Sequence, residues 1–153
     1  MFSIQQKEEN GFRKFILKDE SSGTVAEIIP SCGAILHAFV ANNKGELVNV
    51  IDSYISAADF AENVTSKGFL GSKLSPFVCR LNKGKYHFGE KDYAIENFYL
   101  EKNAIHGKLF DKEFIVTVQT SNNLHASATM KYEYRAEDKG YPFNYDCIIT
   151  WQL

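Results

Sequence analysis

Residues 67–114 read KGFLGSKLSPFVCRLNKGKYHFGEKDYAIENFYLEKNAIHGKLFDKEF, and they decide the class of fold because short apolar runs alternate with turn residues. The run 77–81 predicts a strand, and the polar residues 82–85, with one glycine, predict a turn. Residues 86–88 predict a second strand with both aromatic side chains on one face and the histidine on the other. A turn at 89–92 leads into a third strand at 93–95, so the stretch predicts a β-meander.

The same pattern extends to the N-terminal side. Phe12 to Leu17 and Thr24 to Ile29 are short periodic runs joined by a polar connector, which is typical of a β-hairpin. Ala34 to Val40 and Leu47 to Ile51 predict two further strands with a polar turn between them. Only Ser56 to Glu62 has helical character, because its first serine and the aspartate three residues later have the spacing of an N-terminal cap.

On the C-terminal side the alternation is clearest. Phe114 to Gln119 predicts one strand, and His125 to Tyr134 predicts a second strand whose odd and even positions separate a polar face from an apolar one. Asn144 to Trp151 predicts a final strand. Many short strands with almost no helix favour an all-β fold, an antiparallel sandwich or barrel, and residues 1–153 are expected to form a single domain.

Composition limits the classes of partner and compartment. The chain has 153 residues, 44% hydrophobic content and a formal net charge of −2, so nothing in its charge favours nucleic acid or an anionic membrane surface. Lysines and aromatics between positions 67 and 91 resemble a single-strand nucleic-acid surface only weakly, because acidic residues dilute them. Three widely spaced cysteines, no basic leader and no apolar run of membrane-spanning length predict a cytoplasmic protein without a membrane segment.

Two side chains within the central stretch are candidate binding groups. Arg80 interrupts an apolar run, where a guanidinium needs either an acidic partner, such as Asp92 or Glu96, or a wet cavity. His106 precedes a glycine in a polar loop, so it is either hydrogen-bonded to the backbone or a polar group of a cleft, and the glycine favours the cleft. No histidine has a second ligand at metal-binding spacing, and we expect neither a metal nor another cofactor.

Motifs spread along nearly the whole chain resemble the N-terminal half of the aldose 1-epimerase (galactose mutarotase) family. They are Pro30-Ser31-Cys32-Gly33-Ala34, Gly71, Arg80 with Asn82 and Gly84, His106-Gly107, and Gly140-Tyr141-Pro142. The chain departs from the family pattern at Cys79, where an asparagine is usual, at Lys108, where a second glycine is usual, and at Leu74-Ser75-Pro76.

The resemblance implies a galactose mutarotase-like β-sandwich and a function in carbohydrate metabolism. In the family, the residues matching Arg80 and His106 bind sugar hydroxyls, so the implied partner is a hexose and the implied activity is interconversion of its α- and β-anomers. The family's acid–base pair matches nothing here, and we expect it beyond Leu153, which leaves this chain inactive alone. The alternative is a catalytically silent sugar-binding or interaction module.

The end of the chain carries one more expectation. Trp151-Gln152-Leu153 closes a predicted strand, and an edge strand with unpaired backbone groups recruits partners by hydrogen bonding. The sequence therefore predicts a homo-oligomer formed through this edge strand or a neighbouring one.

Overall fold

A computed structural model describes all residues 1–153, and every strand pair in it is antiparallel. The strands are β1 (Phe2–Glu9), β2 (Phe12–Asp19), β3 (Val25–Ile29), β4 (Ile35–Asn43), β5 (Glu46–Asn49), β6 (Arg80–Leu81), β7 (Lys85–Phe88), β8 (Lys91–Ala94), β9 (Tyr99–Leu100), β10 (Asn103–Ile105), β11 (Ile115–Ser121), β12 (Ala126–Arg135) and β13 (Asn144–Gln152). The helices are α1 (Ala57–Asn63) and the 3₁₀ turns η1 (Pro30–Cys32) and η2 (Asn82–Gly84). The predicted all-β class is confirmed.

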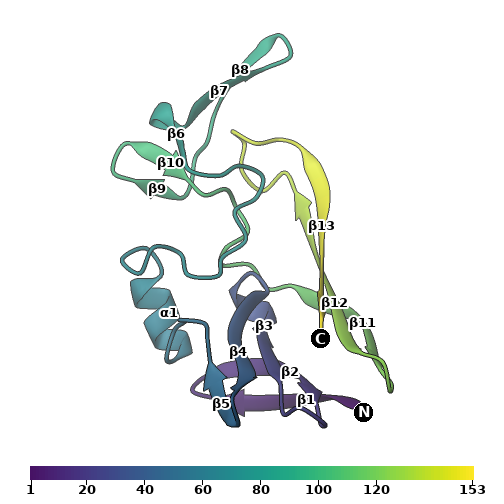
Figure 1. The fold of residues 1–153 in the computed structure, drawn as a ribbon. Coiled ribbons are helices and arrows are strands. Elements are labelled where there is room, and N and C mark those ends of the chain that lie inside the picture. The colour runs from purple at the N-terminus through teal and green to yellow at the C-terminus, as the bar shows by residue number, and fades with distance from the viewer.

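Two sheets form the body of the molecule (Figure 1). One has the order β1-β2-β3-β4-β5 and the other the order β11-β12-β13, and they pack face to face. The inner side chains of β12 are those that the sequence alternation assigned to the apolar face. The shared core consists of Phe15, Leu17, Ala26, Ile28, Ala34, Leu109, Phe114, Ala126, Ala128, Met130 and Tyr134. The predicted sandwich is thus confirmed.

The helix forms where the cap spacing predicts it. Ser56 Oγ accepts the Asp59 backbone N–H at 3.0 Å, which satisfies one of the free donors of the first turn. Phe60 then turns inward and packs edge to face on Tyr54, at a ring separation of 4.9 Å. The seven-residue helix α1 covers a second apolar cluster beside the five-stranded sheet. None of the helices has both the length and the apolar surface that a membrane-spanning helix needs.

Strand β1 has no counterpart in the sequence predictions. It pairs with β2 along its full length, from Phe2 opposite Asp19 to Glu9 opposite Phe12. The two-residue loop is Asn10-Gly11, with φ of 52° and 78°, the positive pair that a type I′ hairpin turn requires. The Asn-Gly dipeptide was the available signal for this strand.

The predicted meander is wrong in its first strand. Only Arg80 and Leu81 of the run 77–81 are strand residues, because Cys79 adopts a left-handed φ of 56° that ends the extended backbone. β6 pairs with β10, in a small sheet of order β6-β10-β9, and not with β7. β7 and β8 form a separate hairpin that projects from the body of the molecule (Figure 1).

Candidate functional site

The β6–β10 pair brings the two candidate residues together. Arg80 lies opposite Ile105 in the ladder, and His106 follows directly, so the side chains belong to neighbouring strand ends. Arg80 is exposed and forms no ion pair in the structure, and neither Asp92 nor Glu96 is its partner. The apolar run that would have buried the guanidinium does not enclose it. Arg80 is therefore open to solvent without the acidic partner, and a cavity around it stays a prediction.

His106 is fixed by its backbone surroundings. Its Nδ1 accepts the Cys79 N–H at 3.2 Å, its own N–H donates to the Cys79 carbonyl oxygen at 3.0 Å, and its ring packs edge-on against Phe69. Because Nδ1 is an acceptor, the ring proton of the neutral form is on Nε2, which has no partner within the chain. Burial, and then the positive charge of Arg80, lower the pKa of His106 below 6.5. At neutral pH the imidazole can donate one hydrogen bond outward.

Gly107 is explained by a backbone contact. It has a φ of 77°, and a Cβ atom there would lie 2.1 Å from the Ser75 carbonyl oxygen. The same carbonyl accepts the Lys108 N–H at 2.7 Å, so segments 75–76 and 107–108 cross at close range. The glycine was taken to favour a cleft at His106, but the neighbour it admits is the backbone of Ser75.

Lys108 points into the interior and forms a buried ion pair with Asp138. The two residues are 2% and 1% exposed. Asp138 also accepts backbone N–H groups from Glu96, Asn97 and Gly140 at 2.8–3.3 Å. Burial raises the pKa of the Asp138 carboxyl, but the Lys108 ammonium and the backbone donors outweigh it and hold the pKa below its ordinary value. The lysine side chain is therefore committed to contacts in the interior.

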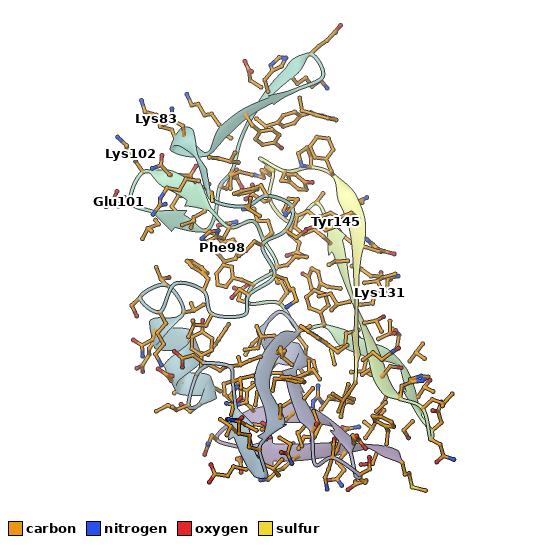
Figure 2. The ribbon with its side chains drawn as sticks, viewed as in Figure 1. Lys83, Phe98, Glu101, Lys102, Lys131 and Tyr145 are labelled. Carbon is orange, nitrogen blue, oxygen red and sulfur yellow. The ribbon has the colours of Figure 1, made fainter.

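Asp138 went unnoticed in the sequence, although it lies two residues before the Gly-Tyr-Pro turn that was singled out there. Its carboxylate joins three segments: the connection from β12 to β13, the turn after β8, and the loop after β10. The Phe98 ring, which lies 5.3 Å from the Lys108 ammonium, is in the middle of the molecule (Figure 2). The ion pair holds the segment that carries His106 against the rest of the fold.

An apolar pocket of about 140 Å³ lies next to β6. It is lined by Pro76, Phe77, Leu81, Tyr86 and Tyr141. Aromatic rings suit the apolar face of a pyranose. Neither Arg80 nor His106 lines this pocket. Leu81 does, and it is the residue next to Arg80 in the chain.

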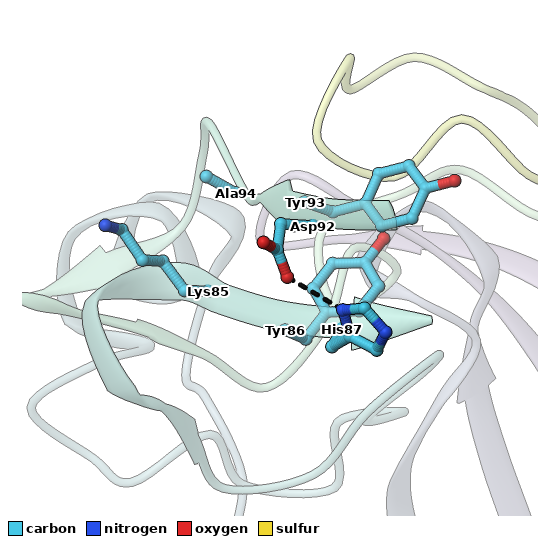
Figure 3. Close-up of a pocket in the computed structure, with 6 residues that line it drawn as sticks. All are labelled: Lys85, Tyr86, His87, Asp92, Tyr93 and Ala94. Atoms are coloured by element: carbon cyan, nitrogen blue, oxygen red, sulfur yellow. Dashed lines mark hydrogen bonds and ion pairs between the residues drawn. The ribbon is translucent and has the colours of Figure 1, made fainter. Parts of the chain in front are cut away.

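A larger pocket of about 500 Å³ lies against the β7–β8 hairpin (Figure 3). Its walls are cross-strand pairs: Tyr86 stacks on Tyr93 at 5.1 Å, and His87 Nδ1 bonds Asp92 Oδ1 at 2.8 Å. The His87 side chain, which the alternation places opposite the aromatic face, is 63% exposed because the hairpin projects into solvent. The Asp92 carboxylate raises the pKa of His87. These contacts are the ordinary stabilising pairs of a hairpin.

The remaining histidines and cysteines form no cluster. His37 Nδ1 shares a hydrogen bond with Ser53 Oγ at 2.9 Å, and burial lowers the pKa of His37. All three cysteines are free, and no three His, Cys, Asp or Glu side chains gather as metal ligands would.

Comparison with known proteins gives a consistent result. A family model described as aldose 1-epimerase matches residues 14–153. The fold is similar to that of a galactose 1-epimerase from Lactobacillus acidophilus, with a TM-score of 0.73 and 19% identity over 100% of this chain and 44% of that one. A galactose mutarotase-like protein from Clostridium acetobutylicum gives a TM-score of 0.73 and 17% identity, over 99% of this chain and 45% of that one.

A GalM/aldose epimerase homologue from C. elegans gives a TM-score of 0.68 at 16% identity, over 98% of this chain and 41% of that one. No curated protein matches the sequence significantly. The chain thus spans less than half the length of the solved structures whose fold it shares.

Proposed function

Because the chain belongs to the aldose 1-epimerase family, we propose that it supplies sugar-positioning side chains to a site that interconverts the α- and β-anomers of a hexose. The observation that supports this proposal is the adjacency of Arg80 and His106 across the β6–β10 ladder, with the donors of both side chains free of protein partners. A guanidinium and an imidazole N–H together offer hydrogen bonds to neighbouring sugar hydroxyls.

Mutarotation needs more than these two groups. A base must take the proton of the anomeric hydroxyl, and an acid must protonate the ring oxygen as the ring opens. In our proposal Arg80 holds a hydroxyl by its charge, and neutral His106 donates from Nε2 while the Cys79 N–H keeps its ring in place. The acid and the base are expected in a part of the family fold outside residues 1–153.

One observation favours the alternative function, a silent sugar-binding or interaction module. No carboxylate forms an ion pair or hydrogen bond with Arg80 or with His106, so no acid or base accompanies the pair in this chain. In that case sugar would bind without being turned over, and the two donors would serve recognition alone.

Two measurements on the 153-residue chain test the proposal. Titration with galactose and with glucose, followed by backbone NMR, is expected to shift the amide signals of Arg80, His106 and their neighbours. Arg80→Met and His106→Asn should each remove those shifts, whereas Lys83→Met, an exposed lysine on the adjacent turn, should keep them. Sugar-induced shifts confined to the β7–β8 hairpin would refute the proposed site.

Polarimetry on freshly dissolved α-galactose separates the two functions. The chain alone is expected not to accelerate the change in rotation, because each missing general acid or base typically costs 10²–10⁴-fold in rate. A version extended by the remaining family fold should restore the activity, and Arg80→Met should lower it there. Catalysis by the 153-residue chain itself would show that the acid and base lie within these residues.

A further inference from the structure

A row of aromatic rings connects the Lys108 ammonium to the His106 imidazole. The ammonium lies 5.3 Å from the Phe98 ring, and Phe98 packs edge to face on Phe110 at a ring separation of 4.9 Å. Phe110 packs in the same way on Phe69 at 5.2 Å, and Phe69 packs on the imidazole at 4.7 Å. We call Phe98, Phe110 and Phe69 the aromatic row. Because Phe110 and Phe69 are only 7% and 8% exposed, a shift of one ring displaces its neighbour.

The lysine end of the aromatic row is fixed by charge. The Lys108 ammonium pairs with the Asp138 carboxylate and donates to the Asn97 carbonyl oxygen at 3.3 Å. Asn97 precedes Phe98, so the lysine holds the backbone beside the first ring and attracts the ring itself by a cation–π contact. The ammonium is buried, which strengthens both interactions.

At the other end, backbone contacts fix the path of the loop but not the rotation of the His106 ring. The Lys108 N–H donates to the Ser75 carbonyl oxygen at 2.7 Å, and the His106 N–H donates to that of Cys79 at 3.0 Å. The last torsion of a histidine side chain has broad minima. Two contacts restrain it here: the Cys79 N–H at 3.2 Å from Nδ1, and the Phe69 ring. The orientation of the imidazole therefore depends on the aromatic row.

We propose that Lys108 is a positioning residue for His106 and acts through the aromatic row. It keeps Nδ1 of the imidazole on the Cys79 N–H and leaves Nε2 free to donate a hydrogen bond to a sugar hydroxyl. The use of Nε2 rests on the proposed function, whereas the orientation of the ring is a property of the chain without sugar.

The scalar coupling across the hydrogen bond from the Cys79 N–H to Nδ1 of His106 tests this orientation. It is measured by NMR on the ¹⁵N-labelled chain, without sugar and with the imidazole neutral, and the wild-type chain is expected to show it. The double variant Lys108→Met, Asp138→Asn removes the ammonium and leaves no unpaired charge in the interior. This variant should lose the coupling and show both neutral tautomers of His106, because Nδ1 is then no longer committed.

Lys112→Met is the matched control. Lys112 also pairs with a carboxylate, that of Glu137 at 2.8 Å, and its ammonium also lies near an aromatic ring, that of Tyr132 at 5.9 Å. Neither partner belongs to the aromatic row, so this variant should keep the coupling and the single tautomer.

Phe98→Leu interrupts the aromatic row and keeps both buried charges. It should lose the coupling as the double variant does, and it decides the matter if the double variant does not fold. The proposal is overturned if the coupling persists in Phe98→Leu or in the folded double variant. It is also overturned if the wild-type chain lacks the coupling or if Lys112→Met loses it equally.

Titration with galactose separates this proposal from the proposed function. The double variant is expected to bind galactose about three- to tenfold more weakly than the wild-type chain, the effect of one hydrogen bond, and Lys112→Met should bind as the wild type does. A wild-type chain that binds no galactose would refute the sugar site alone, because the coupling is measured without sugar. Unchanged affinity in the double variant would overturn the donation from Nε2.

Discussion

His106 has one ring nitrogen committed and one free. The Cys79 N–H occupies Nδ1, and the left-handed φ of 58° at His106 turns the side chain toward that donor. Protonation of Nδ1 would set two donors against each other, so this contact opposes the charged form, as burial and the Arg80 charge do. These contacts favour the neutral imidazole of His106, which can donate a hydrogen bond from Nε2.

The titration of His106 can be predicted from these contacts. Its pKa in the folded chain should lie below the ordinary 6.5, so its contribution to stability is complete above pH 6.5 and decreases as the pH falls from 6.5 toward the folded-state pKa. Arg80→Met should raise this pKa but not restore 6.5, because burial persists; Lys83→Met should leave it unchanged. Long-range ¹H–¹⁵N NMR of the imidazole measures both the pKa and the tautomer, and a pKa at or above 6.5 would contradict this account.

At the scale of elements, periodicity and turn chemistry predicted most strands well. The strands at 12–19, 25–29, 115–121, 126–135 and 144–152 and the helix at 57–63 follow from local patterns alone. Strand β1 was missed although the Asn10-Gly11 turn signalled it, and the errors in the central stretch came from backbone conformations that side-chain type does not encode. Cys79 at positive φ ends an apolar run early, and pairing of β6 with β10 rather than β7 depends on contacts between distant segments.

In the candidate site, too, local sequence patterns predicted some features and contacts between distant segments determined the others. Arg80 and His106 could be chosen from their motifs, and their adjacency is a consequence of strand pairing that no local pattern reveals. Lys108 was noted only as a departure from the family pattern, because its partner, Asp138, lies 30 positions away in the sequence. Only the folded chain shows that the two charges neutralise each other in the interior.

The close approach of segments 75–76 and 107–108 at Gly107 leads to a prediction for stability. Gly107→Ala should destabilise the fold by about 1–3 kcal/mol more than Gly68→Ala. Both glycines have a positive φ, 77° at Gly107 and 71° at Gly68. Only at Gly107 would the new methyl group meet backbone, because it would lie 2.1 Å from the Ser75 oxygen. Urea denaturation of the two variants measures the difference. Equal losses would show that the Ser75 backbone moves aside without cost.

At the scale of the whole molecule, two layers of β-sheet carry the smaller sheet and the projecting hairpin (Figure 1). The Lys108–Asp138 pair joins these parts, because its hydrogen bonds reach the turns on both sides of the small sheet and the connection into β13. The ion pair thus connects segments from three parts of a chain that spans less than half the length of the solved structures whose fold it shares.

Loss of the Lys108–Asp138 ion pair should lower the stability of the whole fold. Asp138→Asn is expected to destabilise the chain by about 3–5 kcal/mol, because the Lys108 ammonium would remain buried without its counter-charge. Glu113→Gln, which breaks the exposed Arg13–Glu113 pair, should cost less than about 1 kcal/mol. Thermal denaturation followed by circular dichroism compares them, and a loss for Asp138→Asn no larger than the control would mean that the pair is dispensable.

The single tryptophan of the chain provides a built-in optical probe. The Trp151 indole N–H donates to the Ala34 carbonyl oxygen at 3.0 Å, which joins the last strand to the opposite sheet, and the Lys73 ammonium lies 4.7 Å from the ring. Emission excited selectively from tryptophan, and not from the 8 tyrosines, therefore originates at the junction of the two sheets. Separation of the sheets would change its wavelength, while melting of the β7–β8 hairpin, which contains no indole, would be invisible to it.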